Sequence, residues 1–158
     1  IVNQHRLTTV YDNAFEGCKA LESIDITCLR VTGSNVFRNC TALKTVTSGV
    51  DTNVGKQMFF GCTALKSFTY YGNNINEGAF NGCTGLTEVV IQSGVESLEL
   101  SAFAGCSGLT NISIADSVSS IGQDVFRNCT GFTDWKAPCT YYNPHIAKLQ
   151  TFLKNYHL

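Results

Sequence analysis

The sequence predicts a solenoid, a β-rich α/β repeat fold in which short parallel strands stack in rungs of about 22–23 residues, closed by a C-terminal helix. Three observations predict it. A Phe-x-x-Cys segment occurs six times, and its cysteines are 22, 22, 21, 23 and 23 residues apart. An alternating apolar pattern follows each segment, and the residue before each cysteine is always Gly or Asn. The repeated cysteines, here called the cysteine column, are Cys18, Cys40, Cys62, Cys83, Cys106 and Cys129.

The repeats leave no room for a second domain, so residues 1–158 are expected to form one solenoid. We assign residues 1–12 to a partial leading repeat, 13–137 to six rungs and 138–158 to a C-terminal cap. Because the chain opens with Ile-Val-Asn-Gln, it is interpreted as a mature or excised piece of a longer protein.

Eleven basic and twelve acidic residues without a charge block argue against nucleic acid as a partner. The chain has no long apolar run, so we expect no transmembrane segment.

A strand is predicted early in each rung. Apolar residues come three, six and eight residues after the column cysteine, as Leu109, Ile112 and Ile114 do after Cys106. The period-2 ending is typical of a strand with one buried face. Ser48 departs from this pattern, because it occupies an inward position.

In the rungs that match the repeat pattern most closely, a second apolar pair follows the strand, for example Val118 with Ile121. In the middle rungs Thr52-Asn53-Val54 and Asn73-Asn74-Ile75 stand in its place. These rungs are therefore expected to be less regular on the side away from the strands. The Phe-x-x-Cys segment is interpreted as a single helical or 3₁₀ turn.

Two columns of small residues predict tight corners. Gly and Asn tolerate positive φ and end helical turns, so the residues before the column cysteines are expected to adopt that conformation. Two residues after each cysteine stands Ala or Gly, which favours close approach of the next rung. The first set is Gly17, Asn39, Gly61, Gly82, Gly105 and Asn128, and the second is Ala20, Ala42, Ala64, Gly85, Gly108 and Gly131.

The column cysteines are expected to be reduced and packed. Adjacent ones would lie about 5 Å apart, which does not forbid a disulfide, but parallel inward side chains suit buried thiols better. The redox states of Cys28 and Cys139, which lie off the column, stay open. The chain has no C-x-x-C pair, so we expect no metal site.

The C-terminal segment is predicted to cap the stack. Asn143-Pro144 provides a helix start, and apolar residues follow at helical spacing over residues 144–156. Terminal rungs of a solenoid need such a lid. A partner-binding helix is the alternative.

The pattern from Leu109 to Cys129, Leu-x-x-Ile-x-Ile…Ser-Val-x-x-Ile-Gly-x-x-Val-Phe-x-x-Cys, resembles the BspA-type leucine-rich repeat. The resemblance covers about residues 7–137. The family includes surface proteins of host-associated bacteria and of parasitic protists. The resemblance implies a right-handed, curved leucine-rich-repeat solenoid.

No catalytic set is apparent. His5, His145 and His157 lie outside the rungs, so no Ser/His/Asp set can be drawn from repeat positions. The outward carboxylates Glu88 and Asp134 are expected about 10 Å apart, beyond the spacing of a glycosidase pair. We therefore expect no enzyme activity and no cofactor. Asn111 is a possible glycan acceptor if the chain is secreted by a eukaryote.

The outward strand residues form the candidate ligand-binding face. Most are small and polar, as on any soluble sheet, so incidental surface residues are the alternative interpretation. Tyr71 and Val90 are the exceptions, because an aromatic beside an exposed aliphatic in the middle of such a face is typical of a binding hot spot. The candidate residues are Thr47, Thr69, Tyr71, Glu88, Val90, Gln92 and Ser113.

The resemblance implies a non-catalytic binding module of a secreted or cell-surface protein. Its partner would be a protein or glycan of the host or of another cell surface, and adhesion would be its use. The alternative is an intracellular, cytoplasmic scaffold that assembles protein complexes.

Overall fold

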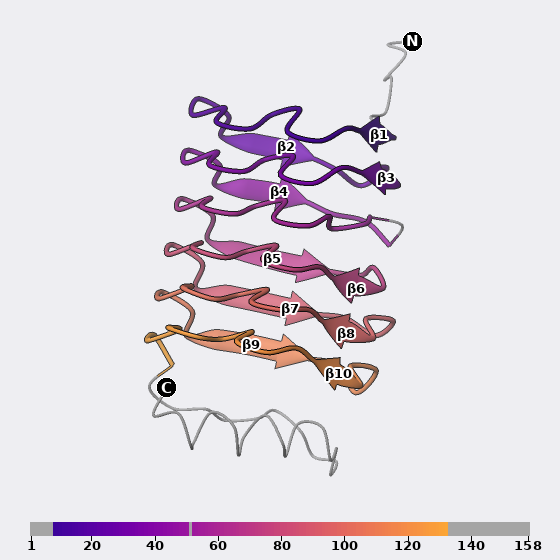
Figure 1. Ribbon diagram of the computed structural model, residues 1–158, viewed down its shortest axis with the longest axis vertical. Helices are drawn as coiled ribbons and strands as arrows, with labels where there is room; N and C mark the ends of the chain where they lie inside the picture. Colours follow the sequence, from indigo (N-terminus) through magenta and orange to yellow (C-terminus); the bar gives the residue numbers. More distant parts are fainter. Residues whose placement is uncertain (1–7, 51, 133–158) are drawn as a thin grey trace.

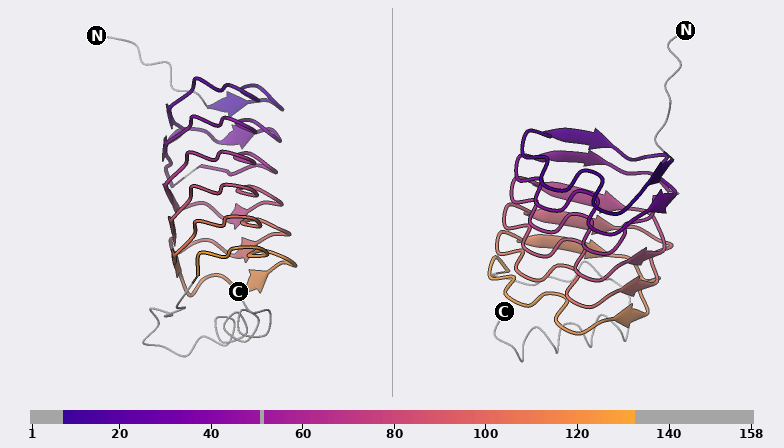
Figure 2. Two further views of the ribbon diagram at one scale, coloured as in Figure 1. Left: turned by 90° about the vertical axis from the view of Figure 1, so that its left-hand side faces the viewer. Right: turned by 45° about the horizontal axis from the view of Figure 1, so that its top comes forward.

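The computed structural model describes residues 8–50 and 52–132, which form a stack of rungs with parallel strands on two sides (Figure 1). One side carries the sheets β2-β4 and β5-β7-β9, and the other carries β1-β3 and β6-β8-β10. Every strand pair is parallel, as the two further views show (Figure 2). The strands are β1 (Thr9–Val10), β2 (Ser23–Asp25), β3 (Val31–Thr32), β4 (Thr45–Thr47), β5 (Ser67–Tyr70), β6 (Asn74–Ile75), β7 (Glu88–Ile91), β8 (Ser97–Leu98), β9 (Asn111–Ile114) and β10 (Ser120–Ile121).

The predicted β-solenoid is confirmed, and the described residues contain no helix. The α/β assignment is therefore wrong for this part of the chain, which is all-β. The predicted capping helix at 144–156 lies outside the described residues, as does Cys139. The handedness of the solenoid and the division into a leading repeat, six rungs and a cap stay predictions.

The Phe-x-x-Cys segments are series of turns closed by hydrogen bonds of the 3₁₀ type, which do not continue into a helix. Backbone donors alternate along the segment. Glu16 and Cys18 donate to carbonyls three residues earlier, whereas Phe15 and Gly17 donate to the next rung, to Val36 and Arg38. A helix would take every donor into its own ladder, and here half of the donors join adjacent rungs instead.

Positive φ recurs at two places in each rung. The predicted one, before the column cysteine, is confirmed, with φ from 58° at Asn39 to 74° at Gly82. The second lies five residues before the cysteine and has φ between 52° and 61°. Its residues are Asn13, Asn35, Gln57, Gly78, Ser101 and Asp124.

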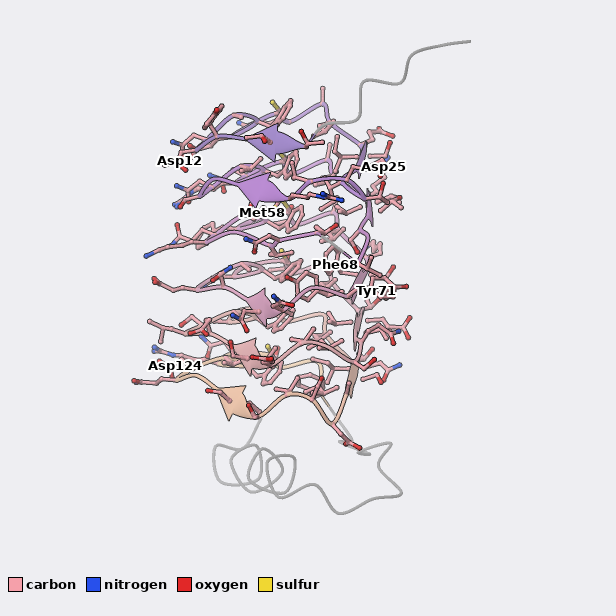
Figure 3. All side chains as sticks on the ribbon, turned by 90° about the vertical axis from the view of Figure 1, so that its right-hand side faces the viewer. Asp12, Asp25, Met58, Phe68, Tyr71 and Asp124 are labelled. Carbon is pink, nitrogen blue, oxygen red and sulfur yellow. The ribbon has the colours of Figure 1, made fainter. Side chains whose placement is uncertain are left out.

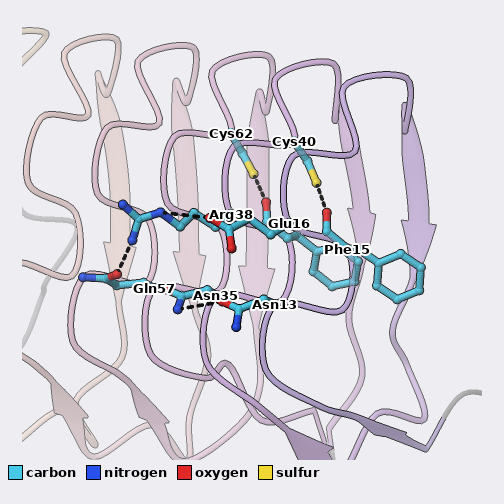
Figure 4. A network of polar contacts seen from close by, with 9 residues as sticks. Asn13, Phe15, Glu16, Asn35, Arg38, Cys40, Gln57 and Cys62 are labelled. Carbon is cyan, nitrogen blue, oxygen red and sulfur yellow. Dashed lines mark hydrogen bonds and ion pairs between the residues drawn. The ribbon is translucent and has the colours of Figure 1, made fainter.

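A Ser101→Asn substitution is expected to raise the free energy of unfolding by about 0.5–1 kcal/mol, because Asn tolerates the left-handed conformation better than Ser. Asn already occupies the equivalent position at Asn13 and Asn35, where the Asn35 Nδ2 donates to the Asn13 Oδ1 at 3.1 Å (Figure 4). Urea unfolding measures the change. Ser120→Asn, on a strand, serves as the control and should bring no gain. Equal changes in both variants would remove the conformational explanation.

A ring column and the cysteine column fill the core side by side. Phe15, Phe37, Phe59, Phe80, Phe103 and Phe126 stack with centroids 5.2–5.7 Å apart. Five of the six column thiols, all but Cys18, donate a 3.1 Å hydrogen bond to a ring-column carbonyl of the preceding rung, as Cys40 does to Phe15 and Cys62 to Phe37 (Figure 4). The six column cysteines form no disulfide, as predicted.

The thiols are held in the protonated form. Burial raises the pKa of the Cys62 thiol to about 12, and burial likewise raises the pKa of Cys83 well above its ordinary value. A hydrogen bond with Cys129 and burial raise the pKa of the Cys106 thiol. Because the thiolate is the reactive form, these column thiols are inert at neutral pH.

The middle rungs are less regular on the side away from the first strands, as predicted. The second side divides between β3 and β6, where Val54 forms only an isolated bridge to Ile75. Tyr70 takes an inward position that Ile occupies in the next two rungs, and its hydroxyl donates to the Asn74 carbonyl at 2.9 Å. A Cβ on Gly72 would lie 2.3 Å from that hydroxyl and 2.4 Å from the Thr52 carbonyl. The large Tyr70 therefore depends on the absence of a side chain at Gly72.

Candidate binding surface

The outward residues of β5, β7 and β9 form rows across the sheet. Strand register places Thr69, Val90 and Ser113 side by side in one row. All three are half-buried, and their inward neighbours, such as Val89, are buried. Three of the predicted residues are thus brought together, with an aliphatic side chain between two hydroxyls.

Tyr71 and Gln92 follow the ends of β5 and β7. The Gln92 amide donates to the Tyr70 carbonyl at 2.9 Å, so the two segments stay paired just beyond the strands. The Tyr71 side chain is 40% exposed. Figure 3 shows it on the outer side of the strands, with Phe68 on the inner side. An exposed aromatic side chain therefore borders the row that contains Val90.

Thr47 lies apart from this ladder. It is exposed on β4, which pairs with β2, and β4 contacts β5 without joining its sheet. A side-chain hydrogen bond connects the two strands here, because the Ser48 hydroxyl donates to the Thr69 carbonyl at 2.5 Å. The structure therefore places Thr47 at the edge of the candidate face.

Glu88 belongs to a different row, with Ser67 and Asn111. Its Oε1 accepts a 3.2 Å hydrogen bond from the Asn111 Nδ2 at the surface. Asp134, the other outward carboxylate that we considered for a glycosidase-like pair with Glu88, lies outside the described residues. Within the described part of the chain, no three His, Cys, Asp or Glu side chains form a group that could hold a metal ion.

A charged clamp joins the first three rungs on another face. The Arg38 guanidinium donates to the Gln57 Oε1 at 2.6 Å and lies 3.6 Å from the Glu16 carboxylate (Figure 4). It also covers the Phe60 ring at 4.4 Å. These contacts pair the charge within the chain, so we interpret the clamp as structural.

A polar hollow of about 450 Å³ lies where the second side of the solenoid is irregular. We had assigned no site there from the sequence, although the Thr52-Asn53 and Asn73-Asn74 pairs mark its place. Val50, which is 73% exposed, and Gly72 contribute to its wall. We call it the asparagine hollow, and its polar residues are Arg30, Thr52, Asn53, Asn73, Asn74 and Asn76.

The fold and its polar outward face define a parallel β-solenoid of the leucine-rich-repeat class. The chain belongs to the BspA type leucine rich repeat family, whose model matches residues 1–74 and 52–146 in six copies. The resemblance inferred from the repeat motif is thereby confirmed.

Three solved structures show the same architecture. A leucine-rich repeat protein from Bacteroides ovatus is 31% identical, with a TM-score of 0.66, and the match covers 78% of this chain and 35% of that one. A leucine rich cell surface protein from Faecalibacterium prausnitzii is 25% identical, with a TM-score of 0.63 and coverage of 85% and 44%. A leucine rich repeat protein from T. pallidum is 22% identical, with a TM-score of 0.56 and coverage of 84% and 75%.

The chain spans about a third of the length of the Bacteroides ovatus protein and less than half of the Faecalibacterium one. No curated protein matches the chain. Over residues 8–50 and 52–132 the chain forms no helix with the length and apolar character that a membrane span requires.

Proposed function

We propose that this chain is a non-catalytic binding module of a secreted or cell-surface protein. Its outward strand face holds a protein or glycan of a host or another cell, and its use is adhesion. Family membership and the likeness to the Faecalibacterium cell surface protein support the surface location. The cytoplasmic scaffold is the alternative that the test below addresses.

The observation that carries the proposal is the exposed Tyr71 beside the row of Thr69, Val90 and Ser113. Tyr is enriched in protein interfaces, because its ring supplies contact area and its hydroxyl supplies a hydrogen bond. The surrounding hydroxyls provide the polar rim that such an anchor needs. Because parallel strand pairing already holds the backbone of this row in place, binding should cost little conformational entropy.

A Tyr71→Ala/Val90→Asp double variant is expected to lose at least roughly tenfold in affinity for the ligand, because truncating an aromatic anchor typically costs a few kcal/mol. The purified chain is screened against extracellular-matrix proteins, mucins and whole host cells. Saturable binding is then compared between the native chain and the variant.

Tyr11→Ala is the matched control, because Tyr11 is 79% exposed and is absent from the strand face. Tyr71→Ala alone guards against misfolding, since Val90 is half-buried. Binding that survives in both Tyr71 variants would place the ligand on another surface. A folded chain that binds no extracellular ligand would favour the cytoplasmic scaffold.

A further inference from the structure

The asparagine hollow is built by the same positions in successive rungs. Counting back from the next column cysteine, Arg30, Thr52 and Asn73 stand ten residues before it. Asn53 and Asn74 stand nine residues before it. In the last two described rungs these positions carry Glu96 and Ser119, then Ser97 and Ser120. The equivalent positions are polar in these rungs as well, but the amide side chains and the guanidinium belong only to the rungs that line the hollow.

The hollow lies at the irregular part of the second side. In regular rungs Val95 and Val118 fill the position eleven residues before the cysteine, and both are buried. Gly72 stands there in the rung that ends at Cys83, with the Tyr70 side chain packed against it, so Gly72 contributes only backbone to the wall. In Figure 1 the second side shows no strand between β3 and β6. The lining residues of the hollow come from this part of the chain. A volume of about 450 Å³ lies within the range of small-ligand sites.

Several lining groups are fixed by hydrogen bonds to the scaffold. The Asn76 Nδ2 donates to the Val54 carbonyl at 2.7 Å. The Asn74 Oδ1 accepts from the Ser97 hydroxyl at 3.0 Å. The Thr52 hydroxyl donates to the Ile26 carbonyl at 3.0 Å. These bonds hold the wall in place, whereas Asn53 and Asn73 are exposed at its mouth.

The lining chemistry favours a ligand rich in hydroxyl groups. Each amide offers two donors and an accepting oxygen, so neighbouring amides match vicinal hydroxyls, which both donate and accept. The described lining contains amides, a hydroxyl and the Arg30 guanidinium. The exposed Val50 adds an apolar surface for the C–H face of a ring.

We propose that the asparagine hollow binds a saccharide residue, with Asn53, Asn73 and Arg30 contacting its hydroxyl or carboxylate groups. This site is separate from the row that contains Val90, and the proposal stands without the strand-face function.

The test is a titration of the isotope-labelled chain with three methyl glycosides, a hexoside, an N-acetylhexosaminide and a hexuronide, followed by NMR of the asparagine side-chain amides. We expect saturable shifts of the hollow amides with at least one glycoside. In an Asn53→Ala/Asn73→Ala variant the affinity should fall by roughly tenfold or more. Ser119→Ala/Ser120→Ala changes the equivalent positions of another rung and should leave the titration unchanged.

The three arms identify the recognised group. A preference for the hexuronide that Arg30→Gln abolishes would assign a carboxylate to Arg30, whereas equal binding of all three would assign hydroxyl recognition to the amides. The proposal is overturned if no glycoside shifts the hollow amides. It is also overturned if the Asn53/Asn73 variant binds as the native chain does. Val90→Asp should not change this titration, which separates the outcome from that of the strand face.

Discussion

Replacing Phe80 by alanine is expected to lower the free energy of unfolding by about 4 kcal/mol, because truncating a buried phenylalanine removes its transfer energy and leaves a cavity. The Phe80 ring is fully buried in the middle of the ring column. Its centroid lies 5.3 Å from that of Phe59, 5.2 Å from that of Phe103 and 4.8 Å from that of Phe68. Equilibrium unfolding in urea, monitored by far-UV circular dichroism, measures the loss.

Phe15→Ala is the matched control at the start of the column. Its ring is half-buried and stacks on Phe37 at 5.3 Å, so its removal should cost less than half as much, about 1–2 kcal/mol. Equal losses at Phe15 and Phe80 would show that stability does not depend on depth in the column.

Raising the pH above about 9 is expected to destabilise the chain steeply, because the folded state retains thiol protons that the unfolded state releases. In the folded chain the pKa of Cys62 lies at about 12, against an ordinary thiol value of 9.0, and the pKa values of Cys83 and Cys106 are raised as well. Each retained proton lowers the free energy of unfolding by about 1.4 kcal/mol per pH unit. Three such thiols together lower the free energy of unfolding by about 4 kcal/mol per pH unit. This loss is absent below the ordinary thiol pKa, where the thiols are protonated in both states.

Urea unfolding at a series of pH values from about 8 to 11 gives the slope. Cys83→Ala should reduce this slope by the contribution of one retained proton, about 1.4 kcal/mol per pH unit. Leu86→Ala, a buried truncation in the same rung that titrates nothing, should lower stability without changing the slope. A slope unchanged by Cys83→Ala would mean that groups other than the column thiols cause the alkaline loss.

The sequence predicted the parts of the fold that repeat with the same residue type. The cysteine column and the positive φ before it were evident, because Gly or Asn occupies that position in every rung. The second position of positive φ was missed, since Gln57 and Ser101 stand among its residues and neither is typical of that conformation. The bonds from alternate amides of the turn segment to the adjacent rung were not predicted, because the sequence does not show which amides bond there.

The candidate face was predicted in part, for a similar reason. Strand periodicity alone put Thr69, Val90 and Ser113 on the outside, and register then aligned them. The separation of Thr47 comes from the break between the sheets of β4 and β5, and periodicity does not show where a sheet ends. The asparagine hollow was missed because Asn pairs are also typical of ordinary turns.

The accommodation of Tyr70 by Gly72 and Thr52 bears on how such a chain can grow by duplication. A regular rung meets the same surface above and below, so copying it preserves the contacts at both junctions. In the rung that contains Tyr70, the backbone at Gly72 lies so close to the Thr52 carbonyl of the preceding rung that a side chain at position 72 would clash with it. These two rungs therefore form one heritable unit, and gain or loss of repeats within this chain should spare the junction between them.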